Sequence, residues 1–272
     1  MAKQVLVLLG NNRQKLSLDY HLIMKKTIIC LAGRKRTGKE TVYKILYPNV
    51  LKPEEFQFAT PLKRFCIDVL GLTHQQCYGN DAERESLTKY QWKDIASHIC
   101  NKYGKNLDDY LTARDVLQVV GTDLMREQFY RNVWAEAGVR EAINSKATTC
   151  VYTDTRFINE IEAIINLSYQ NDFAPPLICR LFRQTGLQDP HSSESSLDSQ
   201  DLYPNQRGIC EVDYSHLEDL GYQQVLPNLW QGDRSYTYYD YLIDNNFSLE
   251  NLKKAVTLML NTHGIYHELN LS

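Results

Sequence analysis

The amino-acid sequence predicts a three-layer α/β/α fold built on a parallel sheet. The stretch 25–32 contains a continuous apolar run that ends at Gly33, a pattern typical of a strand buried on both faces. Further apolar runs then alternate with stretches of helical periodicity, which is the order found in doubly wound sheets. The chain has 272 residues, enough for one large domain that carries insertions.

Composition excludes several classes of protein. Thirty Lys and Arg against 33 Asp and Glu give a net charge of −3, so no overall field attracts long nucleic acids. No apolar run approaches the roughly 18 residues that span a bilayer, and we find no cleavable signal sequence. The seven cysteines never form CxxC, which favours a reducing interior over a disulfide framework or a zinc site. We therefore expect a soluble, intracellular protein without a membrane partner.

The predicted elements alternate along the chain. A helix should begin near Thr41, and a second should have Thr60 as its N-cap with Pro61 at its first position. Thr112 and Asp115 form a capping box that starts a further helix. The predicted strands cover residues 25–32, 56–59, 148–153, 176–182 and 241–244. Two of the remaining predicted helices cover residues 112–120 and 123–144. A further helix carries Ile158–Ile165, and the last one carries Leu249–Leu260.

The pattern predicts a single domain over residues 24–272, preceded by an extension over 1–23. Residues 71–145 form a helical lobe, of which 71–111 is polar and weakly periodic. Residues 183–239 are rich in Ser, Asp, Gln and Tyr, and a structureless stretch of this length indicates a lid or insertion.

The strongest motif is the loop from Gly33 to Thr41, which lies between a buried strand and a helix. Its Gly-x4-Gly-Lys pattern is that of a phosphate-binding loop, in which backbone N–H groups and the lysine face the phosphates. The residue after Lys39 is usually Ser or Thr and binds magnesium, but here it is Glu40, with Thr41 next. Either residue could serve the metal. The alternative is a basic surface turn.

Two other groups of residues point to anion binding. Asp154-Thr155-Arg156 follows a predicted strand, where ligands bind in parallel sheets, although a structural Asp–Arg pair is equally compatible. Around Gly121-Thr122-Asp123 lie several arginines and Trp134, which could grip a phosphate and a base. A helix joint with a core tryptophan is the alternative there.

Some polar clusters do not indicate chemistry. Asp189 and His191 have no second His or Cys at metal-ligand spacing, so a lid loop is the better interpretation. Residues 192–199 are rich in serine but contain no nucleophile elbow, which argues against a serine hydrolase. The tyrosines at 236, 238, 239 and 241 are interpreted as packing residues.

A series of short motifs follows in order from about residue 24 to 260. They are Gly33–Thr41, Pro61-Leu62-Lys63, Arg114 before Leu117-Gln118-x-x-Gly121-Thr122-Asp123, Trp134, Asp154-Thr155-Arg156 with Glu160, Arg183, His191-x-Ser193-Glu194 and Asp244-Asn245-Asn246. Together they resemble the bacteriophage-type deoxynucleoside monophosphate kinases, whose loop also has an acidic residue and a threonine after Gly-Lys. The resemblance covers nearly the whole predicted fold.

This resemblance implies a P-loop nucleoside monophosphate kinase-like fold, with residues 71–145 as the helical acceptor-binding lobe and 183–239 as the lid. It implies transfer of the ATP γ-phosphoryl group to deoxynucleoside monophosphates, with Mg²⁺ as cofactor, in the supply of nucleotides for DNA synthesis. The implied partners are small-molecule nucleotides, and the resemblance is compatible with a homodimer. The implied location is the cytoplasm, which for a viral chain is that of the host.

The resemblance also implies roles for the matching residues. Those implied to bind ATP are Arg36, Thr37, Gly38, Lys39, Glu40, Thr41 and Asn245, with Thr41 or Glu40 at the metal. Those implied to bind the acceptor are Lys35, Lys63, Gln118, Thr122, Trp134, Arg156 and Glu160. Those implied to be catalytic are Lys39, Arg114, Asp154, Arg156 and Arg183.

Two alternatives stay open. Animal-type phosphomevalonate kinases have a similar basic loop, a Pro-Leu-Lys and a strand-borne Asp-Thr-Arg, but the Leu-Gln-x-x-Gly-Thr-Asp block and the length favour the nucleotide enzymes. A catalytically silent nucleotide-binding or scaffold protein is the second alternative. The chain departs from the family in residues 1–23, 71–111 and 196–238, so the sequence does not predict which bases are accepted.

Overall fold

The computed structural model describes residues 25–50, 52–183, 222–224 and 239–262. The chain divides into two compact units, one comprising 1–55 and 145–272 and the other comprising 56–144. The predicted helical lobe, 71–145, falls almost entirely within the second unit, which also takes in the preceding helix. Each unit is described by itself below.

The first unit contains a six-stranded sheet. Strand β1 runs parallel to β5 on one side and to β6 on the other, and β6 runs parallel to β8. Strand β7 is antiparallel to β8 and lies at one edge. The order across the sheet is β2 (Pro53–Phe56), β5 (Thr149–Thr155), β1 (Thr27–Ala32), β6 (Leu177–Phe182), β8 (Tyr241–Asp244) and β7 (Tyr222–Gln224).

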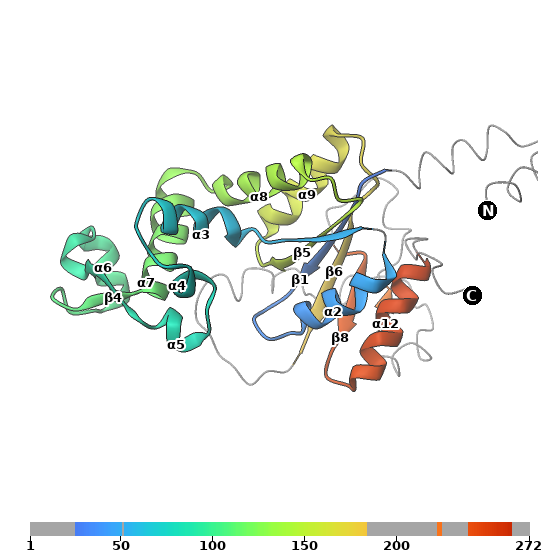
Figure 1. Ribbon diagram of the computed structural model, residues 1–272, viewed down its shortest axis with the longest axis horizontal. Coiled ribbons are helices and arrows are strands. Elements are labelled where there is room, and N and C mark those ends of the chain that lie inside the picture. Colours follow the sequence, from blue (N-terminus) through green and yellow to red (C-terminus); the bar gives the residue numbers. More distant parts are fainter. Residues whose placement is uncertain (1–24, 51, 184–221, 225–238, 263–272) are drawn as a thin grey trace, which may run out of the picture. The chain divides into compact units, whose positions relative to one another are not determined.

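Helices cover both faces of this sheet, which confirms the predicted three-layer α/β/α fold. Helices α2 (Lys39–Leu46) and α12 (Leu249–Thr262) pack against one face, where Ile29 and Leu31 of β1 join one core cluster with residues of both helices. Helix α9 (Ile158–Gln170) contacts β1 and buries its own apolar stripe on the other side (Figure 1). A short 3₁₀ turn, η1 (Tyr47–Asn49), follows α2.

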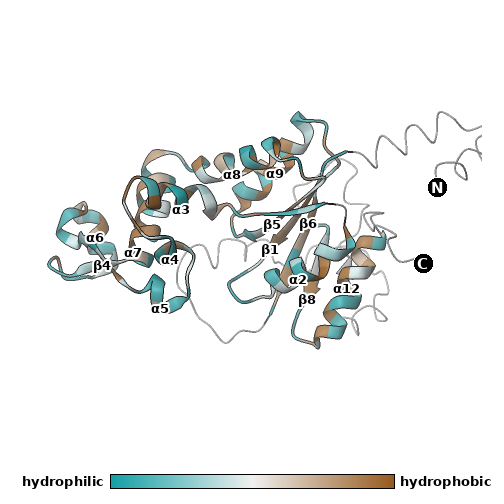
Figure 2. Cartoon of the chain, viewed as in Figure 1, coloured by the Kyte–Doolittle hydropathy of each residue, from teal (hydrophilic) through white to brown (hydrophobic). Residues whose placement is uncertain are grey.

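The apolar periods of the sequence explain these layers. In α12 the buried positions Leu252, Val256 and Leu260 recur every four residues, so one stripe of the helix faces the sheet. Strand β1 is buried almost throughout, as expected for a central parallel strand. Figure 2 shows the strands as the apolar centre of this unit, with polar residues on the outer surfaces of the helices.

The second unit is mainly helical. Its core cluster surrounds Trp92 and includes Cys66, Ile99, Leu111 and Val116. Its elements are α3 (Ala59–Asp68), α4 (His74–Tyr78), α5 (Asp81–Arg84), β3 (Leu87–Gln91), η2 (Trp92–Asp94), α6 (Ser97–Tyr103), β4 (Tyr110–Thr112), α7 (Ala113–Gln118), the π-helix η3 (Val119–Phe129) and α8 (Val133–Asn144). The capping box predicted at Thr112 is present, because Thr112 accepts from Asp115 N and Asp115 accepts from Thr112 N.

Several predicted boundaries were wrong. The second strand is Pro53–Phe56 rather than 56–59, because an edge strand tolerates the exposed residues Glu54 and Glu55. The helix after it begins at Ala59 with Phe58 at the N-cap, so Thr60 and Pro61 lie inside the first turn. The first helix begins at Lys39 rather than Thr41.

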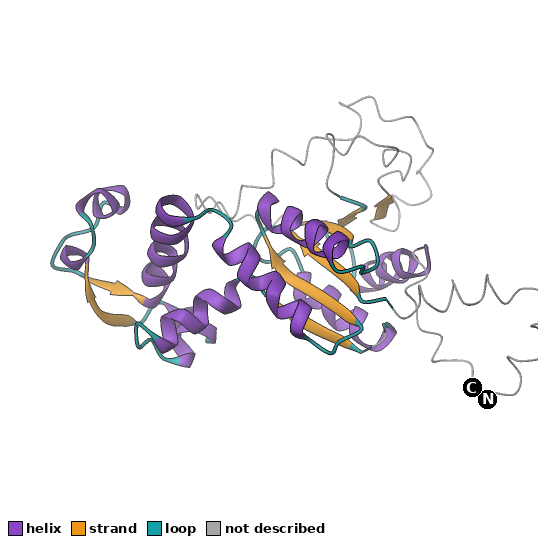
Figure 3. Cartoon of the chain, turned by 90° about the horizontal axis from the view of Figure 1, so that it is seen from above, coloured by secondary structure: helices purple, strands orange, loops and turns teal. Residues whose placement is uncertain are grey.

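Other differences concern the kind of structure. Between 71 and 111 the structure adds an antiparallel pair of strands, β3 and β4, to the expected helices (Figure 3). The helix predicted over 123–144 is interrupted at Tyr130, where the backbone is extended after the π-helix. Within the predicted structureless stretch 183–239, residues 222–224 form β7, because the edge of β8 offers backbone partners.

The strand predicted over 148–153 continues to Thr155, so Asp154 and Thr155 belong to β5 rather than following it. Cys30 of β1 pairs with Tyr152, whereas Ala32 pairs with Thr155, so two residues of β5 oppose one of β1. This is a β-bulge, which re-aims the side chain of an extra residue. Apolar periodicity does not reveal such an insertion.

The extension over 1–23, most of the predicted lid and the motif from His191 to Glu194 lie outside the described residues. Of the tyrosine cluster, Tyr239 and Tyr241 are described, and both are buried as packing residues should be. The six cysteines in the described ranges are free and buried. In the same ranges, the helices are too short or too polar to cross a membrane.

A close contact in the second unit makes the replacement Gly138→Ala informative. Alanine in a helix interior normally adds about 1 kcal/mol of stability relative to glycine. At Gly138, however, an added methyl group would lie 2.6 Å from Cδ1 of the buried Phe58 ring. We expect a net loss of about 1–3 kcal/mol in the free energy of unfolding, measured by urea denaturation.

The same replacement in a Phe58→Leu background serves as the control. There the added methyl group should cost less, because the ring that it meets has been removed. An unchanged or increased stability of the single variant would contradict the close packing of Gly138 in α8 against the Phe58 ring.

Candidate functional site

The loop between β1 and α2 is shaped by two residues in the left-handed region of the backbone. Arg36 has φ +63° and Gly38 has φ +100°. Thr37 closes the turn, because its N–H and its hydroxyl both donate to the carbonyl of Arg34, at 3.4 and 2.9 Å. A positive φ at a non-glycine residue such as Arg36 is uncommon and costs energy, and such residues cluster at ligand-binding loops.

Gly33 is required where the chain leaves β1. A side-chain carbon there would lie 2.7 Å from Thr37 Oγ1 and 2.9 Å from the carbonyl oxygen of Leu181 on the neighbouring strand β6. The amide of Gly33 also donates to the carbonyl of Thr155, at 3.2 Å. The first residue of the loop therefore lies in close contact with both β5 and β6.

The side chain of Lys39 folds back onto this loop. Its ammonium donates to the carbonyls of Gly33 and Arg34, at 2.6 and 2.7 Å, and only 8% of the residue is exposed. Lys39 is also the first residue of α2, and the first amide to donate within the helix is that of Val42, to Gly38. The preceding N–H groups and the helix dipole make this end of α2 suited to an anion.

Asn245 fastens the loop from the end of β8. Its side-chain Nδ2 donates to the carbonyl of Thr37 at 2.9 Å, and its backbone N–H donates to Phe182 at 2.8 Å. A side chain at Gly38 would meet the same amide at 2.2 Å. Asn245 is one of the residues implied to bind ATP, and its side-chain amide lies against the loop backbone.

The two metal candidates differ in their surroundings. The Glu40 carboxylate is exposed and pairs with Lys44 one turn along α2, at 2.8 Å, a contact that raises the pKa of Lys44. Thr41 is half-buried in the first turn of the helix. Among the described residues, no three His, Cys, Asp or Glu side chains cluster as a metal site would require. A hydroxyl and a carboxylate nevertheless suit Mg²⁺, which is often bound through one or two protein oxygens together with substrate phosphates.

The register of the sheet brings the other candidates of the first unit to the same edge. Ala32 pairs with both Thr155 and Arg180, and Phe182 pairs with Asp244. The carboxyl ends of β1, β5, β6 and β8 therefore lie side by side, as at the ligand-binding edge of parallel sheets. The sequence-predicted residues at this edge are Lys35–Thr41, Asp154, Arg156, Arg183 and Asn245.

Glu160 fixes the backbone at Arg156. Its Oε2 accepts hydrogen bonds from the amides of Arg156 and Phe157, at 2.8 and 3.1 Å, and only 2% of the residue is exposed. These bonds satisfy the amides of the N-cap Phe157 and of the residue before it, and a carboxylate at this end of α9 is also favoured by the helix dipole. The arrangement orients Arg156 through its main chain.

Negative charge gathers on the face of the sheet that carries Cys30. The pKa of the Cys30 thiol is raised to about 12, chiefly because the thiol is buried; its hydrogen bond to Thr155 opposes the rise, and the charges of Glu160 and Asp154 add to it. A thiol in this setting stays protonated and is no nucleophile. The carboxylates near it can balance cations that come to this edge, such as Arg156.

The second unit holds the remaining predicted residues. Trp134 is 5% exposed and donates from Nε1 to the carbonyl of Gly121, at 2.9 Å, so the structure places it as a core residue at a helix joint. The ammonium of Lys63 lies 4.3 Å from the centre of the Tyr78 ring. Arg114 is half-buried and paired with carboxylates. Gln118 and Thr122 are half-buried in or next to the π-helix, a structure often found at functional sites.

Two features of the second unit were not predicted. In the π-helix, Asp123 is buried and accepts from Lys102 at 2.6 Å and from Tyr103 at 2.7 Å. The carboxylates that face Arg114 come from Asp81 and Glu85, whose spacing of four residues on a helix was the available signal. Apolar periodicity carries no information about either network.

Comparison with known proteins shows a similarity to a viral protein. A protein of Acanthamoeba polyphaga mimivirus, described as a "putative deoxynucleotide monophosphate kinase", is 28% identical over 151 residues, which cover 52% of this chain and 69% of that protein. No protein-family model matches the sequence. The similarity supports a relation to kinase-like proteins.

The contact between Asn245 and the loop makes a prediction about local stability. Asn245→Ala leaves the buried carbonyl of Thr37 without this donor, so we expect a loss of about 1–3 kcal/mol in the free energy of unfolding. Amide hydrogen exchange over residues 34–39 should accelerate in parallel.

The matched control is Asn246→Ala. The Asn246 side chain is exposed and donates to Asp244, so its removal should change stability by less than about 0.5 kcal/mol. Equal effects of the two replacements would contradict the role of Asn245 in the loop.

Proposed function

We propose that the chain is an ATP-dependent deoxynucleoside monophosphate kinase. It transfers the γ-phosphoryl group of ATP to the 5′-phosphate of a deoxynucleoside monophosphate and releases ADP and the diphosphate. The observation that carries the proposal is the strand–loop–helix unit in which Lys39 folds onto the carbonyls of Gly33 and Arg34. The similarity to the mimivirus protein supports the same class of reaction.

Transfer of a phosphoryl group requires little covalent work from the protein, which must position two phosphates and neutralise their charge. In the proposed site the amides of Arg36–Glu40 and the Lys39 ammonium hold the donor phosphates. An incoming phosphate oxygen would replace a carbonyl as a partner of the ammonium, and the carbonyls hold that ammonium in the loop until then. Asn245 keeps the loop in shape and is proposed to border the donor base.

Roles in binding the acceptor are proposed from the resemblance of the motifs. In the first unit, Lys35 and Arg156 bind its phosphate, and Glu160 and Asp154 orient Arg156. In the second, Lys63 and Arg114 contribute positive charge, and Gln118, Thr122 and Trp134 form the base pocket or its support. Arg183, the first residue after β6, would stabilise charge in the transition state and help to exclude water.

Magnesium fits the oxygen groups near the loop. Thr41 or Glu40 would hold the ion together with the phosphates, and bound Mg²⁺ would neutralise charge that develops on the transferred group. The pairing of Glu40 with Lys44 favours Thr41 as the direct partner.

Turnover of ATP with each of the four deoxynucleoside monophosphates, measured by coupled ADP release, tests the proposed reaction. Phosphomevalonate is the comparison substrate. We expect turnover with at least one nucleotide and none with phosphomevalonate. Turnover of phosphomevalonate alone would overturn the proposal, and ATP binding without turnover of any acceptor would indicate a nucleotide-binding protein that lacks activity.

Replacement of Lys39 should remove this activity. Lys39→Ala deletes the ammonium that faces the donor phosphates, so kcat should fall by about a hundredfold or more. The matched control is Lys253→Ala, which removes an exposed lysine from α12 of the same unit. Circular dichroism should show both variants folded, and full activity of Lys39→Ala would refute the assignment of the loop.

The choice of metal ligand can be tested by binding as well as by activity. Thr41→Val removes the hydroxyl while keeping the shape of the side chain, so it should raise severalfold the Mg²⁺ concentration needed for tight binding of a fluorescent ATP analogue. Glu40→Gln should leave that concentration nearly unchanged, because the carboxylate is engaged by Lys44. The reverse order of effects would assign the metal to Glu40.

A further inference from the structure

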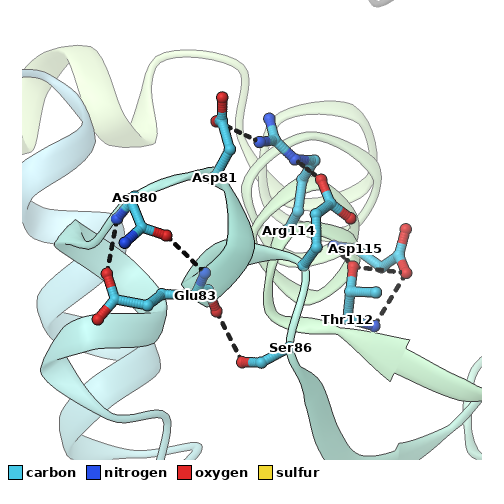
Figure 4. Close-up of polar contacts among 8 residues, drawn as sticks. Asn80, Asp81, Glu83, Ser86, Thr112, Arg114 and Asp115 are labelled. Carbon is cyan, nitrogen blue, oxygen red and sulfur yellow. Dashed lines mark hydrogen bonds and ion pairs between the residues drawn. The ribbon is translucent and has the colours of Figure 1, made fainter.

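Arg114 of α7 is held by two carboxylates from another part of the second unit. Its Nη2 donates to Oδ1 of Asp81 at 3.1 Å, and its Nε makes a short hydrogen bond to Oε1 of Glu85. Asp81 and Glu85 are four residues apart at α5, so they lie on one side of a helical turn. Figure 4 shows the guanidinium of Arg114 turned toward Asp81. We call Asp81 and Glu85 the carboxylate clamp.

The helix that carries the clamp is fixed at its start. Asn80 Oδ1 accepts from the amide of Glu83 at 3.0 Å, and Glu83 Oε2 accepts from the amide of Asn80 at 2.7 Å (Figure 4). Ser86 then joins the two segments, because its carbonyl accepts from the amide of Ala113 at 3.0 Å. A four-residue helix would not be stable alone, so these bonds are what hold the carboxylates in place.

The helix that carries Arg114 is fixed in the same way. The Thr112 hydroxyl accepts from the amide of Asp115 at 3.1 Å, and the Asp115 carboxylate accepts from the amide of Thr112 at 2.9 Å. Arg114 therefore starts from a backbone position that is set on both sides. The remaining freedom lies in its side chain, and the clamp removes much of it.

The carboxylate clamp binds the side edge of the Arg114 guanidinium and does not contact its end. Nε and Nη2 lie on the side edge and contact the clamp, whereas Nη1 donates no hydrogen bond within the described part of the chain. Nη1 and the second hydrogen of Nη2 form the end of the fork, which matches two oxygens of a phosphate. The Arg114 side chain is 30% exposed, so this end is accessible to a ligand.

We propose that Asp81 and Glu85 are positioning residues that aim the end of the Arg114 guanidinium at the acceptor phosphate. This inference rests on the proposed function and identifies residues that act through Arg114. An arginine that is already ordered loses less conformational freedom when it binds a phosphate, so affinity for the acceptor increases.

The clamp also brings negative charge near an anionic ligand, which opposes binding. Both carboxylates are more than half exposed, at 57% and 52%, so water and salt screen this repulsion. The ordering of Arg114 acts through direct hydrogen bonds and is screened less. The positioning effect should therefore be the larger of the two.

The test measures binding and turnover on the full chain. Binding of a deoxynucleoside monophosphate is followed by calorimetry, and KM and kcat are obtained from ADP release. For the double variant Asp81→Ala/Glu85→Ala we expect Kd and KM for the acceptor to rise about fivefold, the size of an exposed ion-pair contribution. KM for ATP should not change. Glu85→Gln should stay within about twofold of wild type, because its amide oxygen still accepts from Nε.

The matched control is Asp108→Ala, which removes an exposed carboxylate of the same unit that pairs with Lys93. It should leave Kd unchanged. In an Arg114→Ala background the double replacement should have no further effect on Kd, because its influence passes through Arg114. Thermal melting verifies that each variant is folded.

The possible outcomes separate the two proposals. A lower Kd in the double variant would show that the clamp competes with the phosphate, and an equal rise of Kd in the Arg114→Ala background would show a role apart from Arg114. Either result overturns the inference. Acceptor binding without turnover in the wild type would refute the proposed reaction, and Kd would still decide the role of the clamp. Absence of acceptor binding would refute both.

Discussion

The contact between the Lys39 ammonium and the carbonyls of Gly33 and Arg34 is the constraint around which the first unit is arranged. For the ammonium to reach them, the chain must reverse between β1 and α2 within a few residues. The left-handed backbone at Arg36 and Gly38 achieves this reversal. The flanking strands then hold the loop, through Thr155 on one side and through Asn245 at the end of β8. The shape of this loop therefore depends on the whole sheet edge.

The parts of the fold that rest on burial could be predicted from the sequence. Strands β1 and β6 are apolar because both faces are covered, and α9 and α12 show a buried stripe. The edge strand β2 was misplaced because Glu54 and Glu55 are exposed, so no apolar run marks it. The bulge in β5 and the π-helix arise from register and local packing, which leave the hydrophobic pattern unchanged.

The candidate site likewise has residues that the sequence could predict and contacts that it could not. Gly33, Gly38 and Lys39 were predictable because glycines in a sharp turn and a lysine at the start of a helix form a local sequence pattern. The contact of Asn245 with Thr37 joins residues 208 positions apart, and the clamp on Arg114 joins residues 29 and 33 apart. Such contacts depend on tertiary structure. The sequence could therefore identify Asn245 and Arg114 as candidates, but it could not predict which residues they contact.

The most direct test of the phosphate-binding loop is hydrogen–deuterium exchange of the full chain with and without ATP and Mg²⁺. If the loop binds the donor phosphates, amides between residues 34 and 42 will exchange more slowly in the presence of ATP. Amides of α6, residues 97–103, will exchange at the same rate with and without it. Unchanged exchange over 34–42 at saturating ATP, or protection confined to another segment, would contradict the account.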